Sequence, residues 1–224
     1  MLFFKEVENG LEHITKTITK HYPEKNPIFK ELYSIHENIN PGFEKERFEK
    51  AFFISELCHR GQNRYSGEPF FAHECRTAYL CNVLLSDSNV TLIGQLHDTV
   101  EDSKKPYNYA LEIYNSFGKD VFFGVMGLSR LKSSTDQFGR LQAFRENFVS
   151  KIGTAKLSDA WDNLLSVKYL PSRSNKSAKE RQLDYLNSTR DNVIPIAKDF
   201  DKRNNKNVSD YIFDLIESNY KRLK

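Results

Sequence analysis

The fold of this chain is indicated most clearly by Thr91-Leu92-Ile93-Gly94-Gln95-Leu96-His97-Asp98-Thr99-Val100-Glu101-Asp102. At about 100° per residue, a helix from Thr91 to Glu101 separates apolar and polar side chains onto opposite faces. The apolar face holds Leu92, Ile93, Leu96 and Val100, and the polar face holds His97, Asp98, Glu101 and Asp102. Gly94, one turn earlier on the polar face, would leave room for a ligand beside the backbone. The pattern predicts a helix that gives one face to the core and the other to chemistry.

The polar face of this predicted helix concentrates negative charge. One imidazole and three carboxylates fall within about one and a half turns, and like charges so close repel one another. A divalent cation would neutralise them, with imidazole and carboxylate as ligands and the other acids free to orient a bound water. The alternative is an acidic, solvated helix end.

A second acidic position, Asp159, follows Gly153. The helix predicted around it has an apolar stripe of Leu157, Ala160, Trp161, Leu164 and Leu165. Lys156, Asp159 and Asn163 fall together beside that stripe. A carboxylate bordering a buried stripe needs a partner, because desolvating it unpaired is costly. Asp159 is therefore either a metal ligand or the partner of Lys156.

The third candidate element is the loop that runs from Gly61 to His73. Ser-Gly-Glu-Pro is turn chemistry, and Pro69 can start the next helix. Arg64 and Tyr65 would lie at the mouth of the loop, where a guanidinium and a phenol can stack on a base or meet phosphate. His73 is either a further ligand or an ordinary half-buried histidine.

These motifs, in this order along the chain, resemble the hydrolase domain of RelA/SpoT-type alarmone enzymes, which are HD-domain phosphohydrolases. The matching stretches are Arg64–Phe70 with His73, His97–Asp102, Phe117-Gly118, Gly127–Leu131, and Lys156–Asp159 with Asn163. The likeness covers roughly residues 48–170 and is weak from Pro171 onward. It implies a compact all-α bundle and a small stand-alone alarmone hydrolase.

The resemblance also implies roles for individual residues. One divalent ion, Mn²⁺ in that family, would be held by His73, His97, Asp98 and Asp159. Glu101 and Asp102 would be the catalytic acids that position and activate the attacking water. The resemblance places Arg64 on the nucleobase and Asn163 on the ribose. Further candidates for substrate contact, from their position in or near the matching stretches, are Tyr65, Ser66, Lys156 and Arg130. The implied reaction removes the 3′-diphosphate of guanosine tetra- or pentaphosphate as pyrophosphate, leaving GDP or GTP.

One departure from the family pattern bears on the substrate. The family usually reads Arg-Leu-His-Asn after the metal-binding aspartate, whereas this chain reads Ala160-Trp161-Asp162-Asn163. The change leaves the implied ligands and acids intact and alters the surroundings of the base, the ribose or the 5′-phosphates. The alternatives are another nucleotide, such as an adenosine alarmone or the 2′-phosphate of NADPH, or a non-catalytic, antitoxin-like binder of an alarmone synthetase.

Composition places the chain among compact proteins of a reducing compartment. It has 224 residues, of which 28% are charged, and a net charge of +3, so no nucleic-acid-binding surface is indicated. Three cysteines without CxxC spacing favour neither disulfides nor a zinc ribbon. No signal peptide and no membrane span are expected. We expect a cytoplasmic enzyme acting on a small nucleotide, with an alarmone synthetase or a second copy as possible partners.

Helical periodicity dominates the remaining sequence, and the predicted class is all-α in one domain over residues 1–224. Helices are predicted over Leu2–Lys20, Ile28–His36, Phe43–His59, Phe70–Leu85, Thr91–Glu101, Tyr107–Phe117, Lys119–Leu128, Gln137–Lys151 and Ala155–Tyr169. A polar loop over Pro171–Ser177 precedes C-terminal helices in residues 171–224. The first of these is expected to break or kink near Pro195, and a polar linker over Asp201–Asn207 precedes the last helix, which most simply closes the core.

Overall fold

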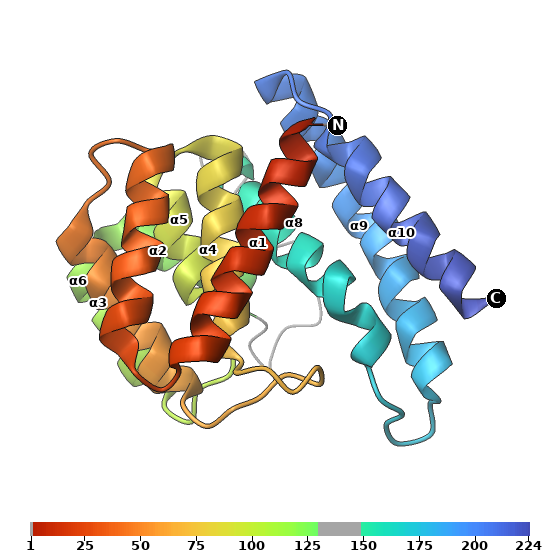
Figure 1. Cartoon of the computed structure of the whole chain (residues 1–224), viewed down its shortest axis with the longest axis horizontal. Helices are drawn as coiled ribbons and strands as arrows, with labels where there is room; N and C mark the ends of the chain where they lie inside the picture. Colours follow the sequence, from red (N-terminus) through yellow and green to blue (C-terminus); the bar gives the residue numbers. More distant parts are fainter. Residues whose placement is uncertain (1, 130–148) are drawn as a thin grey trace.

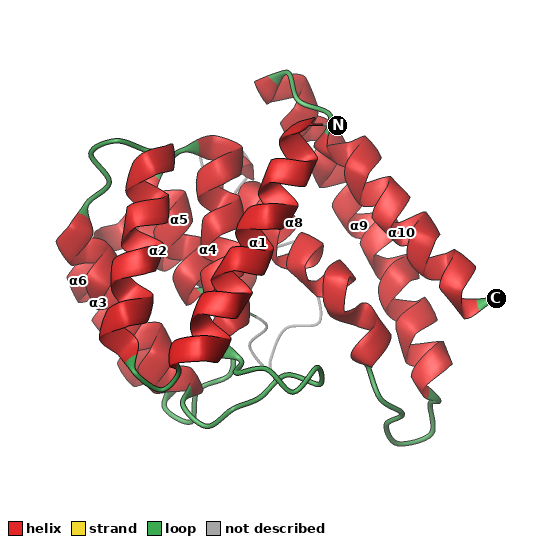
Figure 2. Ribbon diagram, in the orientation of Figure 1, coloured by secondary structure: helices red, strands yellow, loops and turns green. Residues whose placement is uncertain are grey.

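The chain folds into helices joined by loops, as Figure 1 shows in a computed structural model that describes residues 2–129 and 149–224. The helices are α1 (Leu2–His21), α2 (Lys25–Ile39), α3 (Lys45–His59), α4 (Phe71–Leu85), α5 (Ser88–Leu96), α6 (Pro106–Leu128), α8 (Val149–Ser166), the 3₁₀ turn η1 (Val167–Tyr169), α9 (Ala178–Asn204) and α10 (Val208–Leu223). Within those two described ranges there is no strand (Figure 2), so the all-α class is confirmed. The prediction of one domain over 1–224 stays a prediction.

Helix α4 lies at the centre of the fold. It packs against α1, α2, α3, α5 and α8, and nearly all of its residues are buried. Its closest partner is α5, a short apolar helix whose Gly94 faces α4. A Cβ at Gly94 would meet Cys81 Sγ at 2.7 Å and Ala78 Cα at 3.1 Å. Gly94 therefore allows two helices to approach closely, and its predicted role of making room for a ligand is wrong.

An aromatic cluster joins the two ends of the chain to α8. Trp161, fully buried on α8, lies 6.0 Å from the ring of Phe4 on α1 and 4.7 Å from that of Tyr211 on α10. Phe4 and Tyr211 also stack on each other at 4.4 Å. Such rings contribute more than their buried area alone, so Trp161 holds α1 and α10 against the helix that carries Asp159.

The C-terminal helices are fastened by polar caps. Ser177 and Glu180 form a reciprocal capping box at the start of α9. At the start of α10, Asp201 accepts hydrogen bonds from the backbone of Val208 at 2.7 Å and Ser209 at 2.8 Å. The linker predicted over Asp201–Asn207 is therefore too long, because its first four residues belong to α9 and Asp201 serves as a cap.

Helix α5 ends earlier than predicted. It stops at Leu96, and His97 to Glu101 continue as turns, with Thr99 N donating to Leu96 O and Asp102 N to Asp98 O. Three carboxylates at a helix C-terminus oppose the helix dipole, which favours leaving the helix at this point. The prediction of one regular helix to Glu101 was therefore wrong.

Other predicted boundaries fared unevenly. The break at Gly118, which has a φ of 79°, is confirmed inside α6. No break occurs at Gly153, because α8 runs on from Val149, and α9 continues through Pro195 without one. Pro69 lies in the turn before α4 rather than in its first position. The helix predicted over Gln137–Lys151 falls mostly outside the described residues.

No helix within residues 2–129 and 149–224 has both the length and the apolar character that a membrane crossing requires.

The contact at Gly94 is testable. Gly94→Ala should lower the free energy of unfolding by about 1–3 kcal/mol, because the added methyl group meets α4 backbone that cannot swing aside. Urea unfolding would measure it. Gly153→Ala is the matched control, since its Cβ would approach only a side-chain methyl group, Cγ2 of Ile196 at 3.3 Å, and no backbone atom. Equal stability of the two variants would contradict the assignment.

Candidate metal centre and cleft

Four side-chain atoms from three segments converge on one point. His73 Nε2, at the start of α4, lies 3.2 Å from His97 Nε2 after α5 and 3.4 Å from Asp159 Oδ1 on α8. His97 Nε2 lies 3.3 Å from Asp98 Oδ2 and 3.7 Å from Asp159 Oδ1. The separation between His73 Nε2 and Asp98 Oδ2 is 3.8 Å. The structure thus brings together the four residues that the sequence singled out as ligands.

The hydrogen bonds behind the two histidines determine which ring nitrogen carries a proton. His73 Nδ1 donates to Asp162 Oδ2 at 2.7 Å, and His97 Nδ1 donates to Gly94 O at 2.8 Å. In the neutral rings, both Nε2 atoms therefore present lone pairs to the point of convergence. Such partners behind a ligating histidine fix its tautomer and orientation.

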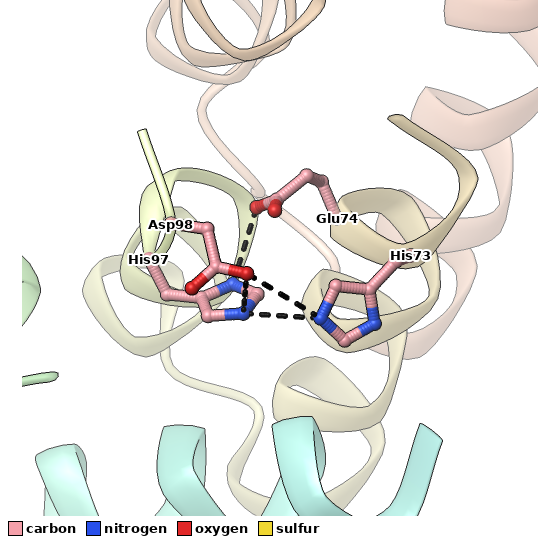
Figure 3. A group of neighbouring side chains, drawn as sticks. All are labelled: His73, Glu74, His97 and Asp98. Atoms are coloured by element: carbon pink, nitrogen blue, oxygen red, sulfur yellow. Dashed lines mark hydrogen bonds and ion pairs between the residues drawn. The ribbon is translucent and has the colours of Figure 1, made fainter. Parts of the chain in front are cut away.

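Glu74 is a further buried carboxylate at this centre (Figure 3). Together with His73, His97 and Asp98 it offers ligand atoms within 4.8 Å of one another. Its Oε2, however, lies 3.1 Å from His97 Nδ1, the nitrogen that points away from the other three ligand atoms. Glu74 therefore supports His97 from behind, and Asp159 completes the set at Nε2.

The same cluster shifts the pKa values of its members. Burial alone lowers the pKa of His73 and His97, but the surrounding carboxylates outweigh it. The net result is a raised pKa for His73 and a pKa well above the ordinary value for His97. Burial raises the pKa of Asp98 and Asp159, yet the imidazoles, and Lys156 for Asp159, hold both below their usual range. Without a metal ion, protons on the imidazoles balance the carboxylates.

This arrangement fits a divalent ion. With the rings neutral, two imidazole lone pairs and two carboxylate oxygens face one another with no hydrogen atom between them. Ligands about 2.1 Å from one ion at right angles lie roughly 3 Å apart, close to the separations found here. His73, His97, Asp98 and Asp159 would therefore hold the ion, and a cation would remove their mutual repulsion.

A cleft of about 780 Å³ opens over this centre. Its described walls include His73, Asp98 and Asp159, together with Glu101 and Asp102 from the turns after α5. Asp102 is exposed at the rim, yet partial burial and the charges of Asp98 and Glu101 raise its pKa to about 6. A carboxyl group with such a pKa exchanges protons near neutral pH, as a general acid or base must.

Arg64, which also lines the cleft, is held in place by hydrogen bonds. Its Nη2 donates to Asn163 Oδ1 at 2.6 Å and to Ser166 Oγ at 2.9 Å, and its guanidinium lies 5.7 Å from the ring centre of Phe70. Asn163 in turn donates to Asp159 Oδ1 at 2.5 Å. The loop residue predicted to meet a base and the residue predicted to meet a ribose are thus in direct contact.

The other predicted substrate contacts are placed differently. Tyr65 and Ser66 line the cleft at its exposed rim, where the Tyr65 ring lies 5.7 Å from the guanidinium of Arg181. Lys156 donates to Asp159 Oδ2 at 2.8 Å, the pairing that the sequence left open as an alternative. Arg130 lies outside the described residues.

The departure from the family pattern mostly faces away from the cleft. Ala160 and Trp161 are buried in the core. Asp162 is buried behind His73, where Arg76 Nε donates to its Oδ1 at 2.5 Å. The aspartate at this position, where the family has a histidine, therefore contacts the far side of His73 and does not line the cleft.

Sequence reasoning missed several supporting residues. Glu74 and Asp162 were not assigned, and neither was His59, which is buried with Nε2 3.6 Å from Glu74 Oε1. The adjacency of Glu74 to His73, and the spacing of Asp162 three residues after Asp159, were the available signals. Burial of these charges could not be read from spacing alone.

Comparison with known proteins places these residues in a family context. No family model matches the chain. It is 34% identical, over 146 residues, to a probable GTP diphosphokinase RSH3, chloroplastic, of Arabidopsis thaliana; the match covers 62% of the chain and 20% of that protein. It is also 28% identical, over 171 residues, to a guanosine-3′,5′-bis(diphosphate) 3′-pyrophosphohydrolase of Borreliella burgdorferi, covering 71% of the chain and 24% of that protein. The chain is a relative of the RelA/SpoT-type proteins. It spans about a fifth of the length of the curated relatives that it matches.

A solved structure supports the fold. It is described as a metazoan orthologue of SpoT that hydrolyses ppGpp and plays a role in starvation responses. The TM-score is 0.59 at 22% sequence identity, and the match covers 77% of this chain and 94% of the other. The resemblance seen in the sequence thus extends to the helical architecture.

Proton displacement gives a test of the centre. Because the pKa values of His73 and His97 are raised, both rings bind protons that a metal ion must displace, so Mn²⁺ affinity should rise with pH. We expect roughly tenfold per pH unit for each proton displaced, from about pH 6 upward until the rings are neutral. Calorimetry in two buffers of different ionisation enthalpy would count the protons. Affinity independent of pH would contradict ligation by these imidazoles.

Proposed function

We propose that the chain hydrolyses the 3′-diphosphate of guanosine 3′,5′-polyphosphates with one divalent ion, releasing pyrophosphate and GDP or GTP. The observation that carries this is the convergence of four ligand atoms, from three residues that line a cleft and from His97 buried behind them, beside Glu101, Asp102 and Arg64 in the same cleft. Supporting it, one relative is described as a guanosine-3′,5′-bis(diphosphate) 3′-pyrophosphohydrolase. A volume of about 780 Å³ is in the range that takes a nucleotide-sized ligand.

The ligand set defines what the ion would do. When bound, a divalent ion lowers the pKa of a water molecule and offsets the negative charge of the phosphates. Mixed imidazole and carboxylate donors are compatible with Mn²⁺, which we propose as the physiological metal. His73 and His97 are held by Asp162 and Gly94 so that their Nε2 atoms face this position before any ligand arrives.

The acids beside the centre supply the proton chemistry. Glu101 and Asp102 line the cleft together with Asp98, so they are placed to orient the attacking water and to take its proton. The raised pKa of Asp102, about 6, suits a group that accepts and returns a proton, although a bound cation would lower it again. We propose Glu101 as the residue that positions the water and Asp102 as its partner.

The part of the cleft lined by Arg64, Phe70 and Asn163 would bind the nucleoside. Arg64 presents a planar guanidinium beside Phe70, a surface on which a nucleobase can stack. Asn163 is placed between Arg64 and Asp159, which suits contact with a ribose next to the reacting phosphate. Tyr65 and Ser66 at the rim, and Arg130, are proposed to contact the base or the outer phosphates.

Product analysis tests the proposal. Purified protein with Mn²⁺ should release pyrophosphate from guanosine tetraphosphate, and a chelator should abolish the release. Adenosine tetraphosphate of the same 3′,5′ pattern and NADPH serve as competing substrates in parallel. Pyrophosphate only from the adenosine compound, or orthophosphate from NADPH, would move the substrate; no product from any of the three would contradict hydrolysis.

Glu101→Gln is the matched variant for this assay. It keeps the size of the side chain and removes its basicity, so kcat should fall by about 10²–10⁴-fold while Mn²⁺ affinity stays nearly unchanged. A variant that retains full kcat would remove Glu101 from the mechanism.

A further inference from the structure

Arg76 on α4 binds two carboxylates at once inside the protein. It is 6% exposed. Its Nη1 and Nη2 donate to Glu68 Oε2 at 2.8 Å and Oε1 at 2.7 Å. Its Nε and Nη2 donate to Asp162 Oδ1 at 2.5 Å and Oδ2 at 3.2 Å. One guanidinium thus makes two bidentate pairs, and we call Glu68, Arg76 and Asp162 the Arg76 bridge.

The two ends of the Arg76 bridge lead to different parts of the site. Asp162 accepts the Nδ1 hydrogen of His73, whose Nε2 faces the metal position. Glu68 lies in the loop before α4, with Oε1 3.8 Å from Arg64 Nε. The Arg76 bridge therefore reaches the proposed metal ligand His73 at one end and the loop that carries Arg64 at the other.

Arg64 closes this connection into a ring. Its Nη2 bonds to Asn163 and Ser166 on α8, the helix that also carries Asp162. The chain of contacts that leads from α8 through Arg76 on α4 to the loop therefore leads back to α8. The loop and the adjoining helix α4 are thus tied to the distant helix α8 by charged pairs at Arg76 and by neutral hydrogen bonds at Arg64.

Burial makes this ring stiff. A charge removed from water needs its partners, so neither Glu68 nor Asp162 can leave Arg76 without a large cost. The planar guanidinium also fixes the angle between its two partners, which a lysine ammonium would not do. A shift of Glu68 is therefore transmitted to Asp162, and from Asp162 to the ring of His73.

We infer that Arg76 is a positioning residue that couples the substrate loop Gln62–Phe70 to the metal ligand His73. The inference rests on the proposed function only in requiring a divalent ion at His73. Its consequence is that a change at either end of the Arg76 bridge alters the other end, although no direct contact between Glu68 and Asp162 is found among the described residues and Arg76 is the partner they share. An ion pair that merely stabilised the fold would show no such crossed effect.

The test changes one end and measures the other. Asp162→Asn should speed hydrogen exchange of the loop amides Arg64, Gly67 and Phe70, which are bonded to backbone oxygens within the loop. Glu68→Gln should weaken the binding of Mn²⁺ to metal-free protein about 2-fold or more, at the lower end of coupling between residues that share partners. Calorimetry with Mn²⁺ alone and exchange measured by mass spectrometry give the two readouts.

Arg76→Lys examines the connection itself. It keeps the charge and removes both forks, so it should weaken Mn²⁺ binding about 10- to 100-fold, as loss of support behind a ligand does, and loosen the loop. Adding Glu68→Gln to Arg76→Lys should then cause no further loss of Mn²⁺ affinity. Lys25→Met is the matched control. Lys25 pairs at 2.7 Å with Glu56, a carboxylate that is as buried as Asp162 but lies outside the ring.

The outcomes separate this inference from the proposed function. Unchanged Mn²⁺ affinity in Glu68→Gln together with unchanged loop exchange in Asp162→Asn would overturn the coupling. Equal effects of Lys25→Met would also overturn it, by showing a general loss of stability. Crossed effects without pyrophosphate release from the guanosine compound would overturn the proposed substrate and leave the coupling standing.

Discussion

The structure depends on four electron-pair donors held against one another in a protein interior. His73 lies on α4, His97 and Asp98 follow α5, and Asp159 lies on α8; these three helices pack against one another. Without a cation, this group is stable only if the imidazoles bind protons, which is what their raised pKa values express. Because the centre lies among apolar helices, any uncompensated charge there raises the free energy of the folded protein, and a bound cation would lower it.

The supporting carboxylates follow from the same constraint. Each ligating histidine has a partner on its far nitrogen, Asp162 for His73 and Gly94 O with Glu74 for His97. Because these partners are themselves buried, they need counter-charges, and Arg76 provides one for Asp162. The layer of charge behind the centre thus extends to the substrate loop through Glu68. The proposed coupling would make the metal position and the position of the loop depend on the same ion pairs.

Much of this site could be predicted from the sequence, and the limits have physical causes. The order of His73, His97-Asp98 and Asp159, read through the resemblance to the RelA/SpoT-type hydrolase domain, selected four residues whose side chains converge in the structure. Periodicity gave the helices, and the break at Gly118 followed from a residue that tolerates positive φ. The end of α5 at Leu96 was missed, since periodicity carries no information about carboxylates opposing a helix dipole. Asp162 and Glu74 were missed because their roles depend on burial and on partners about 90 and 20 residues away.

One divalent ion is proposed to lie at the Nε2 atoms of His73 and His97. Crystals of the protein loaded with Mn²⁺ would show its place by anomalous diffraction. We expect one peak within bonding distance of both Nε2 atoms and of the Asp98 and Asp159 carboxylates, with Glu74 still against Nδ1 of His97. A peak on the Nδ1 side of His97 with Glu74 as a ligand, or no peak between the two rings, would contradict it.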